Sequence, residues 1–217
     1  MPALLTWWRL DIGELAPAAH SDAVEAIGAD LLRRLGESHR RYHNDRHLLE
    51  MVLALEALEA VGVVGGRDSA LGRVAAWFHD AVYLPTAPAG ANEAESAALA
   101  ARDLRALGLS ADDVQSVTAL VLATEQHHLP GTTGLAAAFH DADLWILSAP
   151  EGRFDEYCGQ VRAEYAAVPD AEYRAGRTAV LQPFLHRDHL YATRFARRTW
   201  AERARLNLGR ELARLAA

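Results

Sequence analysis

The sequence contains a single cysteine, Cys158, among 217 residues. One cysteine excludes an internal disulfide framework and is typical of a reducing compartment. No stretch approaches the roughly 20 consecutive apolar residues that a membrane-spanning helix needs. The N-terminal segment reaches Arg9 and Asp11 too early for a secretory signal. These absences predict a cytoplasmic protein that does not enter a membrane.

Positive charge is also scarce. There are 22 Lys and Arg residues against 29 Asp and Glu residues, which gives a net charge of −7. Binding to a nucleic-acid backbone needs a basic face, so nucleic acid is not an expected partner. Hydrophobic residues make up 51% of the chain and charged residues 24%, enough for a sizeable core. A chain of this length is expected to form one domain.

Several catalytic motifs are missing. The glycine-rich segment "GVVGGRDS" at 62–69 lacks the Lys-Ser/Thr ending of a phosphate-binding loop, and there is no HExxH sequence. No serine elbow of the hydrolase type is present. Cys158 lies on the apolar stripe of a helix predicted over 151–167, and no base is evident beside it. We therefore do not expect a nucleotide-binding phosphate loop, an HExxH zinc site, or catalysis by a serine or cysteine nucleophile.

Alternation of period two is absent as well, and the apolar residues instead recur at helical spacing. Further helices are predicted from Ser21 to Gly36, from Asn44 or Asp45 onward, from Asp68 or Ser69 to about residue 80, and over 92–108, 110–130, 134–150 and 171–185, before an arginine-rich helical tail. Asn92 and Ser110 each resemble the first residue of a capping box. The sequence predicts an all-α single domain over 1–217, with a core at about 20–150 and a C-terminal helical extension at 151–217.

Three of these helices carry metal-ligand side chains on apolar stripes. His47 opens the stripe continued by Met51, Leu55 and Leu58, the pair His79-Asp80 closes a second helix, and Asp143 lies between Phe139 and Ile146 on a third. A histidine alone on an apolar face is more often a hydrogen-bonded core residue than a ligand, and a lone buried aspartate is usually a cap or a salt-bridge partner. Together they are costly to bury unless one divalent cation binds them, with Mn, Fe, Co, Ni, Zn and Mg all suited to the donor set.

Five ordered motifs add a resemblance. They are "YHNDRH" at 42–47, "AAWFHDAVY" at 75–83, "NEAESA" at 92–97, "ATEQHH" at 123–128 and "DADLWIL" at 141–147. This set resembles the HD superfamily of metal-dependent phosphohydrolases, and more narrowly a bacterial subfamily described as predicted metal-dependent phosphohydrolases. The likeness extends from about Trp7 to Leu212 and implies an HD-type helical bundle with additional C-terminal helices.

The resemblance implies a metal-ligand set of four residues: His47, His79, Asp80 and Asp143. Asp141 is the alternative to Asp143, since both belong to "DAD", although "ADL" matches the superfamily's Ala-Asp-x-Leu pattern. Asp141 would then orient a ligand histidine.

Other residues are candidates for the substrate or for proton transfer. His127 would bind substrate phosphate or a second metal, with His128 a weaker candidate, and His43 would line the pocket. Glu93 is either a catalytic acid or a favourable charge at a helix start; the acid that relatives often carry just before the Asn-Glu pair is Ala91 here. Arg177 shares a stripe with Tyr173, Val180 and Phe184. It would bind a substrate phosphate or carboxylate, or form an ion pair with Glu164.

The expected activity is hydrolysis of phosphoester or phosphoanhydride bonds in small nucleotide-like substrates. One divalent metal ion would be the cofactor, and Asp80 or Glu93 would accept the proton of water. Two alternatives remain open at this point: a di-iron oxygenase of the same superfamily, or a non-catalytic, metal-stabilised nucleotide-binding module. The sequence leaves the oligomeric state open, a homodimer included.

Overall fold

The computed structural model describes residues 2–127 and 133–217, and every regular element in these ranges is helical. The prediction of an all-α chain is confirmed. The helices of the first half are α1 (Pro2–Leu15), α2 (Ser21–Leu35), α3 (Asp45–Ala60), α4 (Arg67–Phe78), α5 (Ala91–Ala106) and α6 (Ala111–Ala123). The second half contains α7 (Gly134–Asp143), the 3-10 helix η1 (Leu144–Ser148), α8 (Glu151–Glu164), α9 (Asp170–His186), α10 (Arg194–Thr199) and α11 (Ala201–Ala216).

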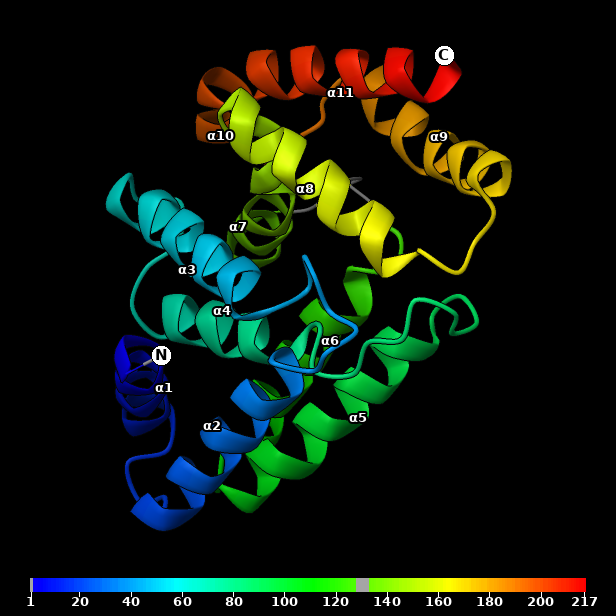
Figure 1. The fold of residues 1–217 in the computed structure, drawn as a ribbon. Coiled ribbons are helices and arrows are strands. Elements are labelled where there is room, and N and C mark those ends of the chain that lie inside the picture. Colours follow the sequence, from blue (N-terminus) through cyan, green and yellow to red (C-terminus); the bar gives the residue numbers. More distant parts are fainter. Residues whose placement is uncertain (1, 128–132) are drawn as a thin grey trace.

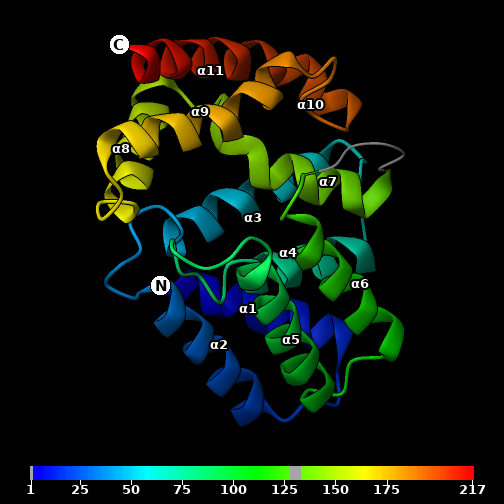
Figure 2. The ribbon, with the colours of Figure 1, turned by 90° about the vertical axis from the view of Figure 1, so that its right-hand side faces the viewer.

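The helices lie in two groups (Figures 1 and 2). Helices α1, α2, α4, α5 and α6 occupy one end of the molecule, and α8 to α11 occupy the other. Helices α3 and α7 lie between the two groups, where α3 contacts α4, α7 and η1. No helix among the described residues is long and apolar enough to cross a membrane.

A first hydrophobic core joins α1 to α7. Its apolar stripes include the predicted one on α3, where Met51, Leu55 and Leu58 are all buried. Trp8 of α1 packs against the rings of Trp77 and Phe78 at the end of α4. This core therefore fixes the end of α4, after which the His-Asp pair of the sequence follows.

A second hydrophobic core joins η1 to α8, α9, α10 and α11. Phe154, Tyr191 and Leu208 are among its fully buried members, and Tyr42 reaches it from the loop before α3. Because Tyr42 belongs to the second core while α3 belongs to the first, the loop at 36–44 connects the two cores directly beside His47.

The structure corrects several local predictions. The helix expected over 134–150 changes to a 3-10 helix after Asp143. Asn92 does not cap α5, because it lies inside the first turn; its side chain instead pairs with both backbone groups of Leu84, at 3.0 and 3.1 Å. Val180 is 53% exposed, so the expected apolar stripe of α9 is interrupted there. Ser110 caps α6 as predicted by accepting a hydrogen bond from the backbone of Asp113.

Candidate functional site

Two buried histidines face each other at the centre of the site. His47 lies in the first turn of α3 and His79 follows α4, with their Nε2 atoms 3.0 Å apart. His47 Nδ1 lies 2.9 Å from the hydroxyl of Tyr42, and His79 Nδ1 lies 2.8 Å from the carbonyl oxygen of Ala76. Because a carbonyl oxygen only accepts, His79 carries a proton on Nδ1, and its neutral form presents the Nε2 lone pair to the site. A Tyr42 hydroxyl that accepts from His47 leaves that ring in the same tautomer.

Two carboxylates surround this pair. Asp80 Oδ2 lies 2.9 Å from His79 Nε2 and 3.6 Å from His47 Nε2. Asp143, the last residue of α7, places Oδ1 3.4 Å from His47 Nε2 and 3.7 Å from His79 Nε2. The ligand atoms of His47, His79 and Asp80 all lie within 4.8 Å of one another. The structure thus brings together the four residues that the sequence proposed as metal ligands.

Burial disfavours every charge in this cluster, and the neighbouring opposite charges outweigh it. Although burial lowers the pKa of His79, the carboxylates of Asp80 and Asp143 raise it to about 9. Burial also opposes ionisation of Asp80, yet the adjacent His79 and His43 hold the pKa of its carboxyl far below the usual range. A hydrogen bond from His47 in its protonated form and the charge of His79 have the same effect on the pKa of Asp143. Both carboxyl groups are therefore ionised at neutral pH, as metal binding requires.

The donor set fits a divalent cation on structural grounds. Two Nε2 lone pairs that face each other at 3.0 Å repel unless a proton or a cation lies between them. Asp80 Oδ2 is buried 2.9 Å from His79 Nε2, and it has no hydrogen-bond donor there when that ring is neutral with its proton on Nδ1, which is unusual for a carboxylate oxygen. A cation shared by two imidazoles and two carboxylates would satisfy all of these atoms. The residues present fit a metal ion, and this donor set suits several first-row metals or Mg²⁺.

Asp141, the alternative ligand, has a different set of partners. Its oxygens accept hydrogen bonds from the backbone N–H groups of Ala192 at 2.6 Å and Thr193 at 2.7 Å, and lie 3.0 Å from His140 Nδ1. Residues two apart on a helix point in different directions, so Asp141 and Asp143 cannot both face the histidines. The structure places Asp143 at the cluster and uses Asp141 to hold the N-terminal end of α10.

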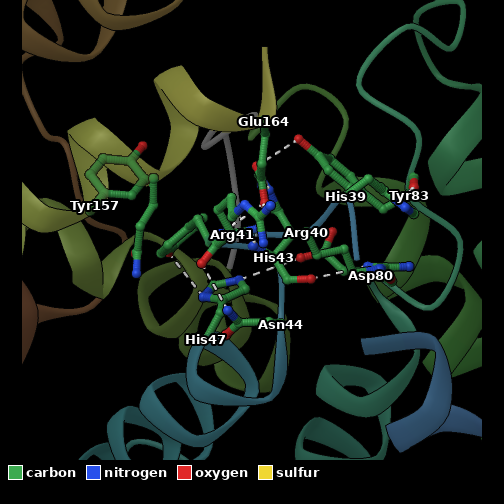
Figure 3. Close-up of polar contacts among 12 residues, drawn as sticks. His39, Arg40, Arg41, His43, Asn44, His47, Asp80, Tyr83, Tyr157 and Glu164 are labelled. Carbon is green, nitrogen blue, oxygen red and sulfur yellow. Dashed lines mark hydrogen bonds and ion pairs between the residues drawn. The ribbon is translucent and has the colours of Figure 1, made fainter. Parts of the chain in front are cut away.

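A buried arginine that the sequence analysis missed supports the His-Asp pair. Arg40 donates hydrogen bonds to the backbone carbonyls of Asp80 at 2.7 Å, Ala81 at 3.2 Å and His43 at 3.1 Å (Figure 3). Its side chain is fully buried and lies over the ring of Tyr83. No sequence signal distinguishes Arg40 from the neighbouring Arg41, because both stand in a polar loop.

Glu164 holds the loop that carries His43. One of its oxygens accepts from the backbone N–H groups of residues 41, 42 and 43 at 2.7, 2.8 and 3.0 Å. The other lies 2.6 Å from His43 Nδ1 and accepts from the Tyr83 hydroxyl at 3.0 Å (Figure 3). Burial alone would raise the pKa of Glu164, but these contacts lower it to about 2. The ion pair between Glu164 and Arg177 that the sequence suggested is not formed, because Glu164 is fully engaged with this loop.

The four-residue cluster opens onto a cavity of about 300 Å³. The other candidates from the sequence also line it, namely His43, Glu93, His127 and Arg177. Glu93 lies in the first turn of α5, half-buried at the cavity wall, and its side chain makes no hydrogen bond or ion pair within the described ranges. The cavity is thus bounded by metal-ligand groups together with acidic, imidazole and guanidinium side chains.

His127 reaches the cluster from the segment after α6. Its Nδ1 lies 3.8 Å from Asp143 Oδ2, and burial lowers its pKa. The residue has a positive φ of 45°, and its carbonyl oxygen accepts a hydrogen bond from Arg187 at 2.8 Å. A residue other than glycine is strained in this region of backbone conformation and keeps it only where the surrounding structure enforces it. The surroundings therefore hold His127 in place. His128 lies outside the described residues.

Arg177 lies on α9 at the wall of the cavity. It donates a short hydrogen bond to the hydroxyl of Tyr157, and its guanidinium lies 5.1 Å from the centre of that ring. Arg177 Nε is buried without a hydrogen-bond partner, and no carboxylate within the described residues forms an ion pair with this arginine. A positive charge therefore faces the cavity without a protein counter-ion.

Comparison of the chain with protein-family models, with curated proteins and with solved structures found no match.

Proposed function

We propose that this protein is a metal-dependent hydrolase of phosphoester or phosphoanhydride bonds in small phosphorylated molecules. The observation that carries the proposal is the pair of facing imidazoles flanked by two ionised carboxylates at the wall of a cavity. The ordered motifs at 42–47, 75–83 and 141–147, which resemble the HD superfamily, support the same assignment.

Four residues would hold the cation, namely His47, His79, Asp80 and Asp143. When bound, a divalent cation supplies Lewis-acid polarisation of a phosphoryl oxygen and lowers the pKa of its bound water toward neutrality. The carbonyl of Ala76 orients the ring of His79 for this purpose, and the hydroxyl of Tyr42 orients that of His47.

The remaining side chains would act on water and on the phosphate. The ionised carboxylate of Asp80 accepts a proton as the water oxygen bonds to phosphorus and the bond to the leaving oxygen breaks. Glu93, at the wall of the same cavity, is the second acid positioned for this role. His127 is disfavoured as a cation by burial and donates a hydrogen bond to a phosphoryl oxygen in its neutral form.

The position of His127 also favours a second candidate function. Its Nδ1 is 3.8 Å from Asp143 Oδ2, so it could complete a second metal site beside the first, as a di-iron oxygenase would need. His43 is less suited to such a site, because its Nδ1 is already engaged by Glu164. Metal content separates the two functions: two irons per chain favour oxygenation, and a single divalent ion favours hydrolysis.

The test is a hydrolysis screen on phosphomonoesters, phosphodiesters and nucleotides with added Mn²⁺, Co²⁺, Ni²⁺ or Mg²⁺. The wild-type chain should show metal-dependent turnover, and His79→Ala should lose at least about 100-fold in kcat/KM, because a direct ligand is worth more than the tenfold to 100-fold of an orienting residue. His189→Ala is the matched control, since His189 is exposed and makes no contact with the cluster. Wild-type turnover no greater than that of His79→Ala on every substrate would refute the proposal. Metal binding without turnover would indicate the binding module instead.

A further inference from the structure

Two chemically different groups of side chains line the cavity. The first, here called the metal end, consists of the histidines and carboxylates of the proposed metal site, and the second consists of Arg177 and Tyr157. Of the five N–H donors that a guanidinium offers, a single one, on Nη2, is used by a protein acceptor in the described chain. Burying a cation without a counter-ion is costly, and such a group is retained where a ligand supplies the missing charge.

A chain of contacts through two tyrosine rings connects Arg177 with the metal end. The guanidinium contacts Tyr157, whose ring centre lies 4.5 Å from that of Tyr42, and Tyr42 in turn contacts His47 through its hydroxyl. Arg177 forms no hydrogen bond or ion pair with any of the four cluster residues, so a group bound by Arg177 is distinct from a phosphoryl group bound beside His47.

The hydroxyl of Tyr157 adds a donor to this end of the cavity. Burial raises the pKa of Tyr157, so the phenol keeps its proton at neutral pH. Because Arg177 donates to the phenolic oxygen, the phenolic hydrogen is free to donate to another acceptor. A fork of guanidinium N–H groups beside a phenolic O–H matches the acceptor pattern of a carboxylate or a phosphate.

Resting on the proposed function, we propose that Arg177 and Tyr157 form an anion subsite that binds a second negatively charged group of the substrate. The substrate class is then a small phosphate ester or anhydride that carries another carboxylate or phosphate. Its reacting phosphoryl group lies at the metal end, and its second anionic group lies against Arg177.

The test measures equilibrium binding of molecules that cannot be hydrolysed. The probes are ω-phosphonocarboxylates with two to five methylene groups, each paired with the alkylphosphonate of equal length that lacks the carboxylate. Calorimetric titration of Mn²⁺-loaded protein should show that the carboxylate tightens binding about tenfold to 100-fold at one chain length, the range expected for a charge-assisted hydrogen bond. That length measures the separation of the two ends.

Three variants connect this preference to the subsite. Arg177→Gln should bind both members of each pair equally, and Arg177→Lys should keep part of the preference because it retains the charge but not the fork. Tyr157→Phe should lower the preference without abolishing it. Arg174→Gln is the control, because Arg174 stands on the same helix but pairs with Asp170 at the surface, and it should behave as wild type.

Two results would overturn the inference: a wild-type protein that binds both members of each pair equally at every length, or an Arg177→Gln protein that keeps the preference. Thermal unfolding checks that each variant is folded. If Arg177→Gln does not fold, Arg177→Lys is compared with the wild-type protein in its place. Failure of the proposed function has a different signature. It appears in the hydrolysis screen as absent metal-dependent turnover, whatever the probes show.

Discussion

The two hydrophobic cores contribute different chemistry to the same cavity. The first core, built by α1 to α7, positions His47, His79 and Asp80 at helix ends. The second core, built by η1 and α8 to α11, supplies a guanidinium and a phenol, Arg177 and Tyr157. One core thus positions the proposed metal site and the other the proposed anion subsite. Metal binding and anion recognition should therefore respond separately to changes in the two cores.

The largest effects are expected when one buried leucine is truncated in each core. Leu58 of α3 and Leu208 of α11 are both fully buried, one in each core. Leu58→Ala and Leu208→Ala should each lower the free energy of unfolding by about 2–5 kcal/mol, as measured by urea denaturation. Only Leu208→Ala should also weaken the carboxylate preference of the phosphonate probes, because α11 packs against the helix that carries Arg177. Equal loss of this preference in both variants would contradict the division.

Glu164→Gln should weaken the connection between the cores. The pKa of Glu164 is lowered from 4.5 to about 2, so its stabilisation is complete above about pH 4.5 and is lost as the pH falls toward 2. This shift corresponds to about 3 kcal/mol at pH 7. Urea denaturation at pH 7 should show a loss of that order for the variant, and the difference from wild type should shrink as the pH approaches 2.

Glu156→Gln is the matched control on the same helix. Glu156 pairs with Arg46 across the same two regions, but both side chains are more than 40% exposed. An exposed pair contributes about 1 kcal/mol or less. A pH-independent loss in Glu164→Gln, or an equal loss in Glu156→Gln, would show that the connection does not depend on the buried carboxylate.

Apart from the Glu156→Gln control, the smallest loss of stability is expected near the end of α7. Asp141→Asn would place an amide N–H₂ against one of two backbone N–H groups. We expect the free energy of unfolding, measured by urea denaturation, to fall by about 1–3 kcal/mol. The loss should be the same whether or not EDTA has removed the metal. Calorimetric titration with Mn²⁺ should give wild-type affinity for this variant. Asp143→Asn should instead lower the affinity for Mn²⁺ at least about 100-fold. The reverse pattern would make Asp141 the ligand.

Much of the arrangement could be predicted because it depends on local periodicity. The stripe from His47 through Met51 and Leu55 is set by helical spacing, and so is the position of His79 at the end of its helix. Residues 141 and 143 lie on different faces of one helix, but sequence alone does not say which face meets the histidines. That choice depends on the packing of α7 against α3 and α4.

The contacts that the sequence did not reveal join distant segments. Glu164 binds a loop 121 residues earlier in the chain, and Arg40 reaches the carbonyl of a residue 40 positions later. Arg40 stands in a polar loop outside every motif. Glu164 follows Val161 by three on the buried face of α8, but this spacing does not show which loop the carboxylate meets. The expected pairing of Arg177 with Glu164 was wrong for the same reason, since the loop at 41–43 engages that carboxylate with three N–H groups.

The late position of Glu164 has a consequence for the order in which the protein assembles during translation. Every buried member of the first core precedes residue 143, so a nascent chain holds this whole core before α8 has been made. Domains fold from the N-terminus as they are synthesised. The residues of the histidine pair are therefore synthesised ahead of those of the guanidinium end of the cavity, and the turn at 41–43 gains its anchor only once residue 164 has left the ribosome.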